Sequence, residues 1–104
     1  AQLLSKPEKP SAVICGSDVL AVGAMLQAHK MGLRVPEDIS ITGFDDISLA
    51  RVTTPSLTTV RVPQHAMGRK AAEVLLALLN QELGQDLQHE LMTTIVDRGT
   101  LARV

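Results

Sequence analysis

The 104-residue sequence has few of the residues that mark several common classes of binding site. It contains a single aromatic residue, Phe44, and a single cysteine, Cys15. One aromatic ring cannot form the stacking platform that binds single-stranded nucleic acid. One cysteine excludes an internal disulfide and is typical of a reducing compartment, so we expect a cytoplasmic protein.

An excess of charge of one sign is also lacking. Ten Lys and Arg stand against eleven Asp and Glu, which gives a formal net charge of −1. A protein that binds phosphate backbones by itself normally carries a basic face. This chain alone is therefore a poor candidate for nucleic-acid binding. No apolar run approaches the roughly 20 residues of a membrane span, so we expect no membrane partner.

The histidines do not form a metal-binding pattern. His29, His65 and His89 are scattered, and the cysteine is not at a useful spacing from them. Zinc ligands usually recur at short, regular spacings. Ser17 also lacks the Gly-x-Ser-x-Gly context of a nucleophilic serine. We therefore expect no metal, no cofactor and no enzyme activity.

The first half of the chain has the pattern of a strand–helix–strand unit. Residues 1–11 are typical of a connector. Residues 12–15 form a short apolar run, predicted to be a strand buried on both faces. A helix is predicted over residues 19–31, ended by Gly32, and a second strand over residues 39–44. The unit has the size that a right-handed parallel crossover requires.

The helix over residues 19–31 is predicted to bury one apolar stripe. The stripe consists of Leu20, Ala24 and either Ala28 or Met31. Asp45-Asp46 is predicted to begin a short helix that runs through Arg51. The hydroxyl-rich and β-branched residues 53–59 favour an extended crossing segment.

The longest periodic stretch follows this crossing segment. Apolar residues recur at helical spacing over residues 67–83. Pro63 is predicted to occupy the first helical position, and Gly84 to end the helix. A final strand is predicted over residues 91–96, so the chain is predicted to be an α/β protein.

Two polar turns are predicted at the carboxyl ends of the two parallel strands, where open α/β sheets bind ligands. Ser17 and Asp18 follow the first strand, and Asp45 and Asp46 follow the second. Either residue of the first pair could simply cap the helix. In the second pair, Asp45 could accept hydrogen bonds from a ligand. Equally, one aspartate could cap the short helix while the other is solvated.

Several short motifs, taken in order, resemble the LacI/GalR family of bacterial transcription regulators. They are Cys15-Gly16-Ser17-Asp18, Ala21-Val22-Gly23-Ala24, Gly32–Ile41, Gly43-Phe44-Asp45-Asp46, Pro55–Val60, Met67-Gly68 and Arg98-Gly99-Thr100. The resemblance implies an incomplete periplasmic-binding-protein-like type I fold with parallel strand–helix–strand elements.

The resemblance also implies how the chain is divided between two lobes. Residues 1–11 would connect to a missing upstream part, and residues 12–57 would form a β-α-β unit of the C-terminal lobe. Residues 58–94 would contain a crossing segment and the long helix of the N-terminal lobe. Residues 95–104 would return to the C-terminal lobe as a strand.

The function implied is the effector-binding and dimerisation portion of a LacI-type regulator. It would respond allosterically to a small molecule, a sugar or a related metabolite. Operator DNA would be bound through a helix-turn-helix that this chain does not contain. One alternative is a periplasmic sugar-binding protein of a transport system, and another is a small enzyme that uses Asp45 and Asp46.

Three residues are implied as effector contacts. Asp45 matches the family's ligand-binding aspartate. Ser17 stands where the family more often has Asn, and it offers one hydroxyl in place of a separate donor and acceptor. Asp18 is the third candidate, interpreted mainly as the helix cap.

The resemblance further implies a homodimer formed through the first helix and the short helix. The apolar candidates for that surface are Val22, Met25, Leu26, Leu49, Ala50 and Val52. Each of them could instead belong to the ordinary core.

Overall fold

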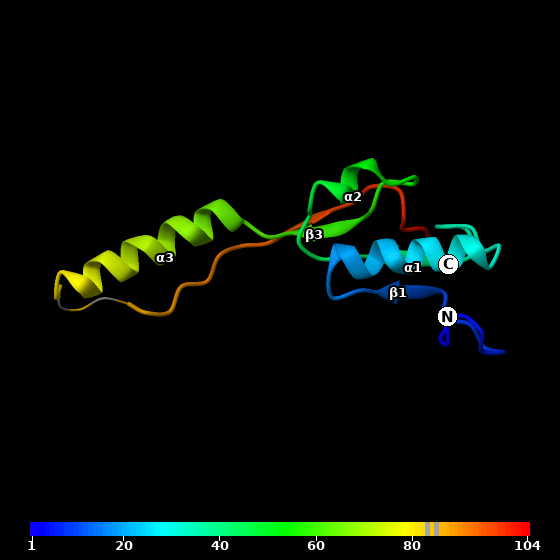
Figure 1. Cartoon of the computed structure of the whole chain (residues 1–104), viewed down its shortest axis with the longest axis horizontal. Helices are drawn as coiled ribbons and strands as arrows, with labels where there is room; N and C mark the ends of the chain where they lie inside the picture. Colours follow the sequence, from blue (N-terminus) through cyan, green and yellow to red (C-terminus); the bar gives the residue numbers. More distant parts are fainter. Residues whose placement is uncertain (83, 85) are drawn as a thin grey trace. The chain divides into compact units, whose positions relative to one another are not determined.

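The computed structural model describes residues 1–82, 84 and 86–104. These residues fall into two units (Figure 1). Unit 1 comprises Ala1–Arg61 and Thr94–Val104, and unit 2 comprises Val62–Thr93. The assignment of these parts to the lobes of a larger core stays a prediction.

Unit 1 contains the predicted strand–helix–strand element. Strand β1 (Ala12–Ile14) is followed by helix α1 (Asp18–Lys30) and strand β2 (Ser40–Thr42). The two strands pair in parallel, with Ala12 opposite Ser40 and Ile14 opposite Thr42. The parallel crossover and the helix predicted over residues 19–31 are confirmed, with the helix shifted by one residue.

The predicted burial of the first strand on both faces is wrong. Ile14 is 87% exposed, and only Val13 of β1 packs against the core. Within the part of the chain that the structure describes, β1 pairs with β2 alone. A continuous apolar run therefore marks an edge strand here rather than a central one.

The other edge of β2 is covered by two segments that lie far along the chain. The amide of Gly43 donates to the carbonyl of Thr58 at 3.0 Å, and the amide of Ile41 donates to that of Thr100 at 2.9 Å. Beyond these contacts lie strand β3 (Thr59–Arg61) and strand β4 (Thr94–Val96), which pair antiparallel. The chain therefore leaves unit 1 and re-enters it along one two-stranded ladder.

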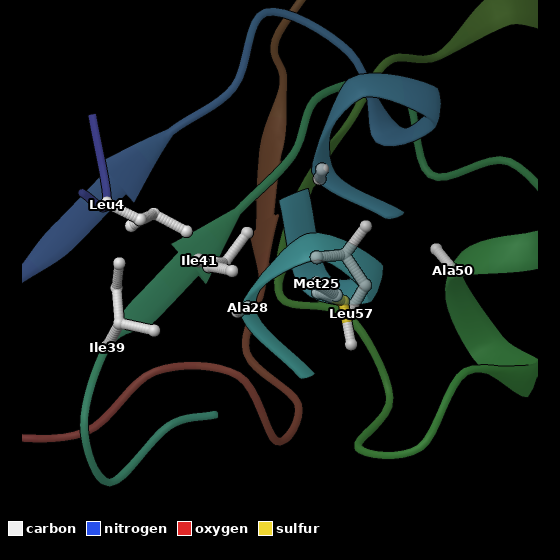
Figure 2. Close-up of a cluster of buried hydrophobic side chains, with 8 residues drawn as sticks. Leu4, Met25, Ala28, Ile39, Ile41, Ala50 and Leu57 are labelled. Carbon is white, nitrogen blue, oxygen red and sulfur yellow. The ribbon is translucent and has the colours of Figure 1, made fainter. Parts of the chain in front are cut away.

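The core of unit 1 gathers between β2 and α1 (Figure 2). Its fully or almost fully buried members include Ile39, Ile41 and Leu57. Helix α1 contributes Ala21, Met25 and Ala28. The predicted stripe is therefore right for Ala28 and wrong for Leu20, which is 63% exposed. Apolar residues surround most of α1, so helical spacing alone did not select the face that packs.

Local capping explains both ends of α1. Ser17 is the N-cap, and its hydroxyl oxygen accepts a hydrogen bond from the amide of Leu20 at 3.3 Å. Gly32 follows the C-cap with φ +74°, and the amide of Leu33 donates to Ala28. The predicted glycine stop is confirmed, whereas the interpretation of Asp18 as the cap is wrong.

The short helix begins later than predicted. Helix α2 is Leu49–Val52, with Ser48 at its N-cap position. Asp45 and Asp46 have φ values of +114° and +59°, which a right-handed helix does not allow. The prediction that Asp45-Asp46 begins this helix is therefore wrong.

Unit 2 contains helix α3 (Gln64–Leu79). Pro63 is its N-cap rather than its first helical residue, so that prediction is wrong by one position. The helix ends well before Gly84, because Asn80 is the C-cap and Gln81 has φ +57°. The predicted end at Leu83 lies outside the described residues. None of the helices that the structure describes is long and apolar enough to span a membrane.

Candidate functional site

The two predicted polar turns lie side by side at the carboxyl ends of β1 and β2. The amide of Cys15 donates to the carbonyl of Thr42 at 2.8 Å. The amide of Asp18 donates to the carbonyl of Phe44 at 2.9 Å. The convergence predicted from the parallel pairing is therefore confirmed, at the sheet edge where α/β proteins place ligands.

Asp45 presents a carboxylate without a partner. Its side chain is half-buried and has no hydrogen bond or ion pair among residues 1–82, 84 and 86–104. Its backbone amide donates to the carbonyl of Val60 at 2.9 Å, and its φ is +114°. Such a backbone costs about 1–3 kcal/mol and persists only where the surroundings hold it. This carboxylate is free to accept hydrogen bonds from a bound molecule.

Ser17 lies next to this carboxylate-bearing loop and is half-buried. Its hydroxyl oxygen is used by the helix cap at Leu20, but its hydroxyl proton is not used within the described part of the chain. A serine hydroxyl can accept and donate at the same time. Ser17 can therefore cap α1 and donate one hydrogen bond to a ligand.

Asp18 is fully buried and joins three segments of unit 1. Its carboxylate accepts hydrogen bonds from the hydroxyl of Thr59 and from the amide of Ile47, the latter at 2.8 Å. Gly43 packs directly against it, because a Cβ at residue 43 would overlap the Asp18 carboxylate. Both carboxylate oxygens thus have partners within the fold, and an effector contact by Asp18 stays a prediction.

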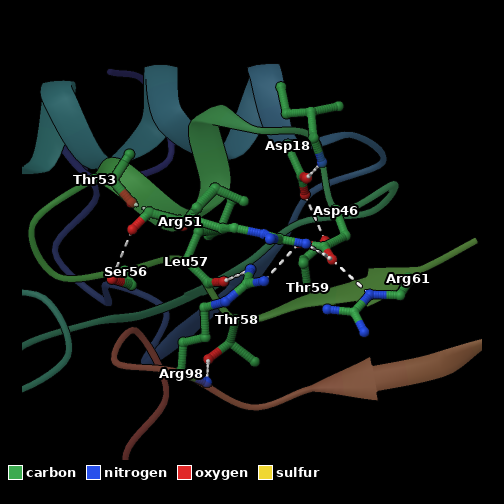
Figure 3. A network of polar contacts seen from close by, with 12 residues as sticks. Asp18, Asp46, Arg51, Thr53, Ser56, Leu57, Thr58, Thr59, Arg61 and Arg98 are labelled. Atoms are coloured by element: carbon green, nitrogen blue, oxygen red, sulfur yellow. Dashed lines mark hydrogen bonds and ion pairs between the residues drawn. The ribbon is translucent and has the colours of Figure 1, made fainter.

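Asp46 is the acceptor of an arginine cluster (Figure 3). Its side chain is 2% exposed and accepts hydrogen bonds from Arg61 Nε and Arg98 Nη2, both at 2.7 Å. Arg51 Nη2 lies 3.8 Å from the same carboxylate. Asp46 is therefore neither a helix cap nor a solvated residue, contrary to the alternatives that the sequence suggested.

The arginines keep Asp46 ionised. Burial by itself would raise the pKa of this carboxyl, but the hydrogen bonds and charges of Arg61 and Arg98 outweigh burial and lower it. A general acid needs a proton near neutral pH. Asp46 does not hold one, so this geometry does not favour Asp45 and Asp46 as an acid–base pair.

Arg98 also connects the C-terminal segment of unit 1 to residues 57 and 58. Its Nη1 donates to the carbonyl of Leu57 at 2.9 Å, and its amide donates to the hydroxyl of Thr58 at 3.0 Å. The Thr100 hydroxyl in turn accepts from the amide of Thr58. Sequence analysis used Arg98-Gly99-Thr100 only as part of a resemblance. The hydrogen-bond partners of Arg98 are 40 or more positions away in the sequence, and Asp46 is 52 positions away. No local pattern of residues could therefore reveal this role.

The six residues predicted for a dimer surface differ in their burial. Met25 and Ala50 are buried in the core, as their alternative interpretation stated. Leu26, Leu49 and Val52 are exposed by 60%, 43% and 73%. Val22 is half-buried. Val22, Met25 and Leu26 line a groove of about 770 Å³ together with residues of the 29–37 segment and residues 53–55.

Metal binding finds no support in the described residues. No three His, Cys, Asp or Glu side chains among them gather closely enough to hold an ion.

Comparison with known proteins gives a consistent result along almost the whole chain. The profile of the periplasmic binding protein-like domain matches residues 1–101. The HTH-type transcriptional repressor PurR of Erwinia tasmaniensis is 40% identical over 101 residues. This match covers 97% of the chain but only 30% of that relative.

Solved structures of transcription regulators share this fold. A LacI family regulator from Mycobacterium smegmatis superposes with a TM-score of 0.81 at 39% identity, over 98% of this chain and 37% of that one. A LacI family regulator from Lactobacillus casei with bound sucrose gives a TM-score of 0.82 at 33% identity, over 96% and 37%. The chain thus spans about a third of the length of the proteins that it matches.

Proposed function

Because the chain belongs to the periplasmic binding protein-like domain family, we propose that it forms part of the effector-binding core of a bacterial LacI-type transcription regulator. The resemblance to the LacI/GalR family that the short motifs indicated is confirmed, as is the α/β fold. The complete protein would bind a small molecule and adjust its affinity for operator DNA in response.

The observation that carries this proposal is the unpartnered carboxylate of Asp45 at the carboxyl edge of the parallel strands. Asp45 would accept hydrogen bonds from hydroxyl groups of the effector, and Ser17 would donate one. A polyhydroxylated compound fits this acceptor-rich arrangement. The bound sucrose of the Lactobacillus casei regulator supports a saccharide as the class to test first.

The relatives favour a regulator over the alternative of a transport protein. They are described as a repressor and as transcription regulators. Because this chain has a net charge of −1, DNA binding would depend on another part of the complete protein. A protein that meets operator DNA would act in the cytoplasm, and catalysis has no role in this proposal.

We also propose that two copies associate through the exposed part of the α1 and α2 surface. Leu26, Leu49 and Val52 expose large apolar side chains there, and Leu26 also lines the groove of about 770 Å³. Apolar side chains gathered beside a groove are typical of protein–protein interfaces. Met25 and Ala50 would support this surface from the core.

Replacing Asp45 tests the effector site. The complete polypeptide that carries this segment is titrated by calorimetry with sucrose, glucose and fructose. We expect at least one of them to bind and Asp45→Asn to weaken that binding about 10- to 100-fold, since a hydrogen bond to a charged group contributes roughly 1.5–3 kcal/mol. DNA binding without the sugar should stay unchanged.

Asp38→Asn is the matched control, because Asp38 forms its ion pair with Arg34 within one loop and contacts neither Asp45 nor Ser17. An effector response that is identical in the wild type and in Asp45→Asn would contradict the proposal.

A further inference from the structure

Asp45 and Asp46 form a left-handed dipeptide that the surrounding contacts hold in place. Their φ values of +114° and +59° are uncommon for residues other than glycine. The Asp45 amide is held by the carbonyl of Val60, and the Asp46 carboxylate is held by Arg61 and Arg98. The conformation of the candidate effector residue therefore depends on contacts that the chain itself provides.

Those groups lie where the chain passes between the two units. Arg61 is the last residue of unit 1 before unit 2, and Thr94 is the first residue after it. These two residues are partners across the β3–β4 ladder. Arg98 follows Thr94 by four positions and bonds to the other oxygen of Asp46. The carboxylate of Asp46 therefore binds a residue near each of the two points where the chain crosses between the units. We call these two points, at residues 61–62 and 93–94, the passages.

We propose that Asp46 is a positioning residue for the effector site, which fixes Asp45 through Arg61 and Arg98 and links it to both passages between the units. This inference rests on the proposed function. A movement of the 45–46 backbone on effector binding would be passed to β3 and β4 through two short, charge-assisted hydrogen bonds. Such bonds are shorter and stronger than neutral ones.

A second aspartate–arginine pair in unit 1 provides the control. Asp38 accepts hydrogen bonds from Arg34 Nε and Nη2, both at 2.9 Å, and these bonds lower the pKa of Asp38 to about 2. The pair joins residues four apart within one loop. Asp38→Asn therefore removes the same kind of carboxylate without touching either passage.

Amide hydrogen exchange of the complete polypeptide tests the positioning role without any ligand. In Asp46→Asn, we expect the amides of Asp45, Ile47 and β3–β4 to exchange at least tenfold faster, while the amides in the middle of α1 stay unchanged. Arg61→Lys keeps the charge but loses the Nε hydrogen bond, so it should show a smaller change at the same amides. Asp38→Asn should leave all of them unchanged.

A role limited to overall stability would accelerate exchange in α1 and in β3–β4 together, and that result would overturn the proposal. If Asp46→Asn does not fold, Arg61→Lys decides the question, because its side chain is half-exposed and the change is mild. Unchanged exchange at Asp45 and β4 in Arg61→Lys would then reject the positioning role.

Titration with sucrose, glucose and fructose separates this proposal from the effector assignment. Should the wild type bind none of the three, the proposed saccharide effector fails, while the exchange result still decides the positioning role. Should it bind one, Asp46→Asn should raise the Kd for that sugar about tenfold, and Asp38→Asn should not. A Kd that Asp46→Asn leaves unchanged would overturn the proposal.

Discussion

At the scale of single residues, neighbouring side chains in this chain have very different surroundings. The Asp45 carboxylate has no partner among the described residues, whereas the carboxylate of Asp46 is almost fully buried among arginines. Ser17 caps a helix from a half-buried position, whereas Asp18 joins three segments from complete burial. Two residues that are adjacent in the sequence can therefore have different roles, one available for binding and the other stabilising the fold.

Gly43 is required by the burial of Asp18. A Cβ at this position would overlap the Asp18 carboxylate and lie 3.1 Å from Asp18 Cα and 3.0 Å from Leu57 Cδ2. We expect Gly43→Ala to lower the free energy of unfolding by about 1–3 kcal/mol, since overpacking of this kind strains the backbone. Urea denaturation monitored by circular dichroism measures the change.

Gly23→Ala is the control for this substitution. Gly23 lies within α1, and a Cβ at this position would meet no atom within 4 Å beyond its neighbours in the helix backbone. Alanine there should raise the free energy of unfolding by about 0.5–1 kcal/mol, because it favours the helix. Equal effects of the two substitutions would contradict the packing argument at Gly43.

At the scale of elements, features set by local chemistry were predicted well. The strand–helix–strand order and the glycine stop at Gly32 follow from short-range signals. The buried face of α1 was not predictable, because Leu20 and Ala21 are both apolar and only the packing against β2 distinguishes them. The start of α2 was missed because distant arginines hold Asp46 in a left-handed conformation.

The candidate site was predictable to the same extent. Parallel pairing brings the residues that follow β1 and β2 together, so the convergence of Ser17 with Asp45 could be inferred from the order of elements. The partners of Asp46 come from β3 and from the segment after β4. Their approach depends on how the chain returns to unit 1, and no local pattern contains that information.

The N-cap of α1 gives a prediction at this scale. Ser17→Ala removes the acceptor for the amide of Leu20, and we expect the free energy of unfolding to fall by about 0.5–1 kcal/mol. Ser17→Asp retains an acceptor beside the helix N-terminus and should keep most of the stability. Urea denaturation of both variants provides the measurement. If Ser17→Ala and Ser17→Asp have the same free energy of unfolding, the N-cap hydrogen bond does not contribute measurably to stability.

At the scale of the whole molecule, much apolar surface is left uncovered by the described residues. Along α3, Leu75, Leu76 and Leu79 are exposed by 57%, 59% and 69%. Leu75 lines a shallow depression of about 400 Å³ together with Leu87 and Leu91. Soluble monomers rarely expose contiguous apolar patches of this kind. Since the chain spans about a third of the length of its relatives, we expect other parts of the proposed regulator to cover this face.

The isolated 104 residues should therefore associate with one another at micromolar concentration. The exposed leucines of α3 and the open edge at β1, where Ile14 is 87% exposed, would both gain from contact with a second copy. Light scattering coupled to size-exclusion chromatography should give a mass above that of one chain.

The double variant Leu76→Lys, Leu79→Lys should shift the mass toward the monomer, because it places charge on the apolar face of α3. The control Ala66→Lys, Glu73→Gln changes the net charge by the same two units at exposed positions on another side of α3 and keeps every leucine, so it should leave the association intact. A single-chain mass with a cooperative thermal transition would show instead that these faces are stable in water.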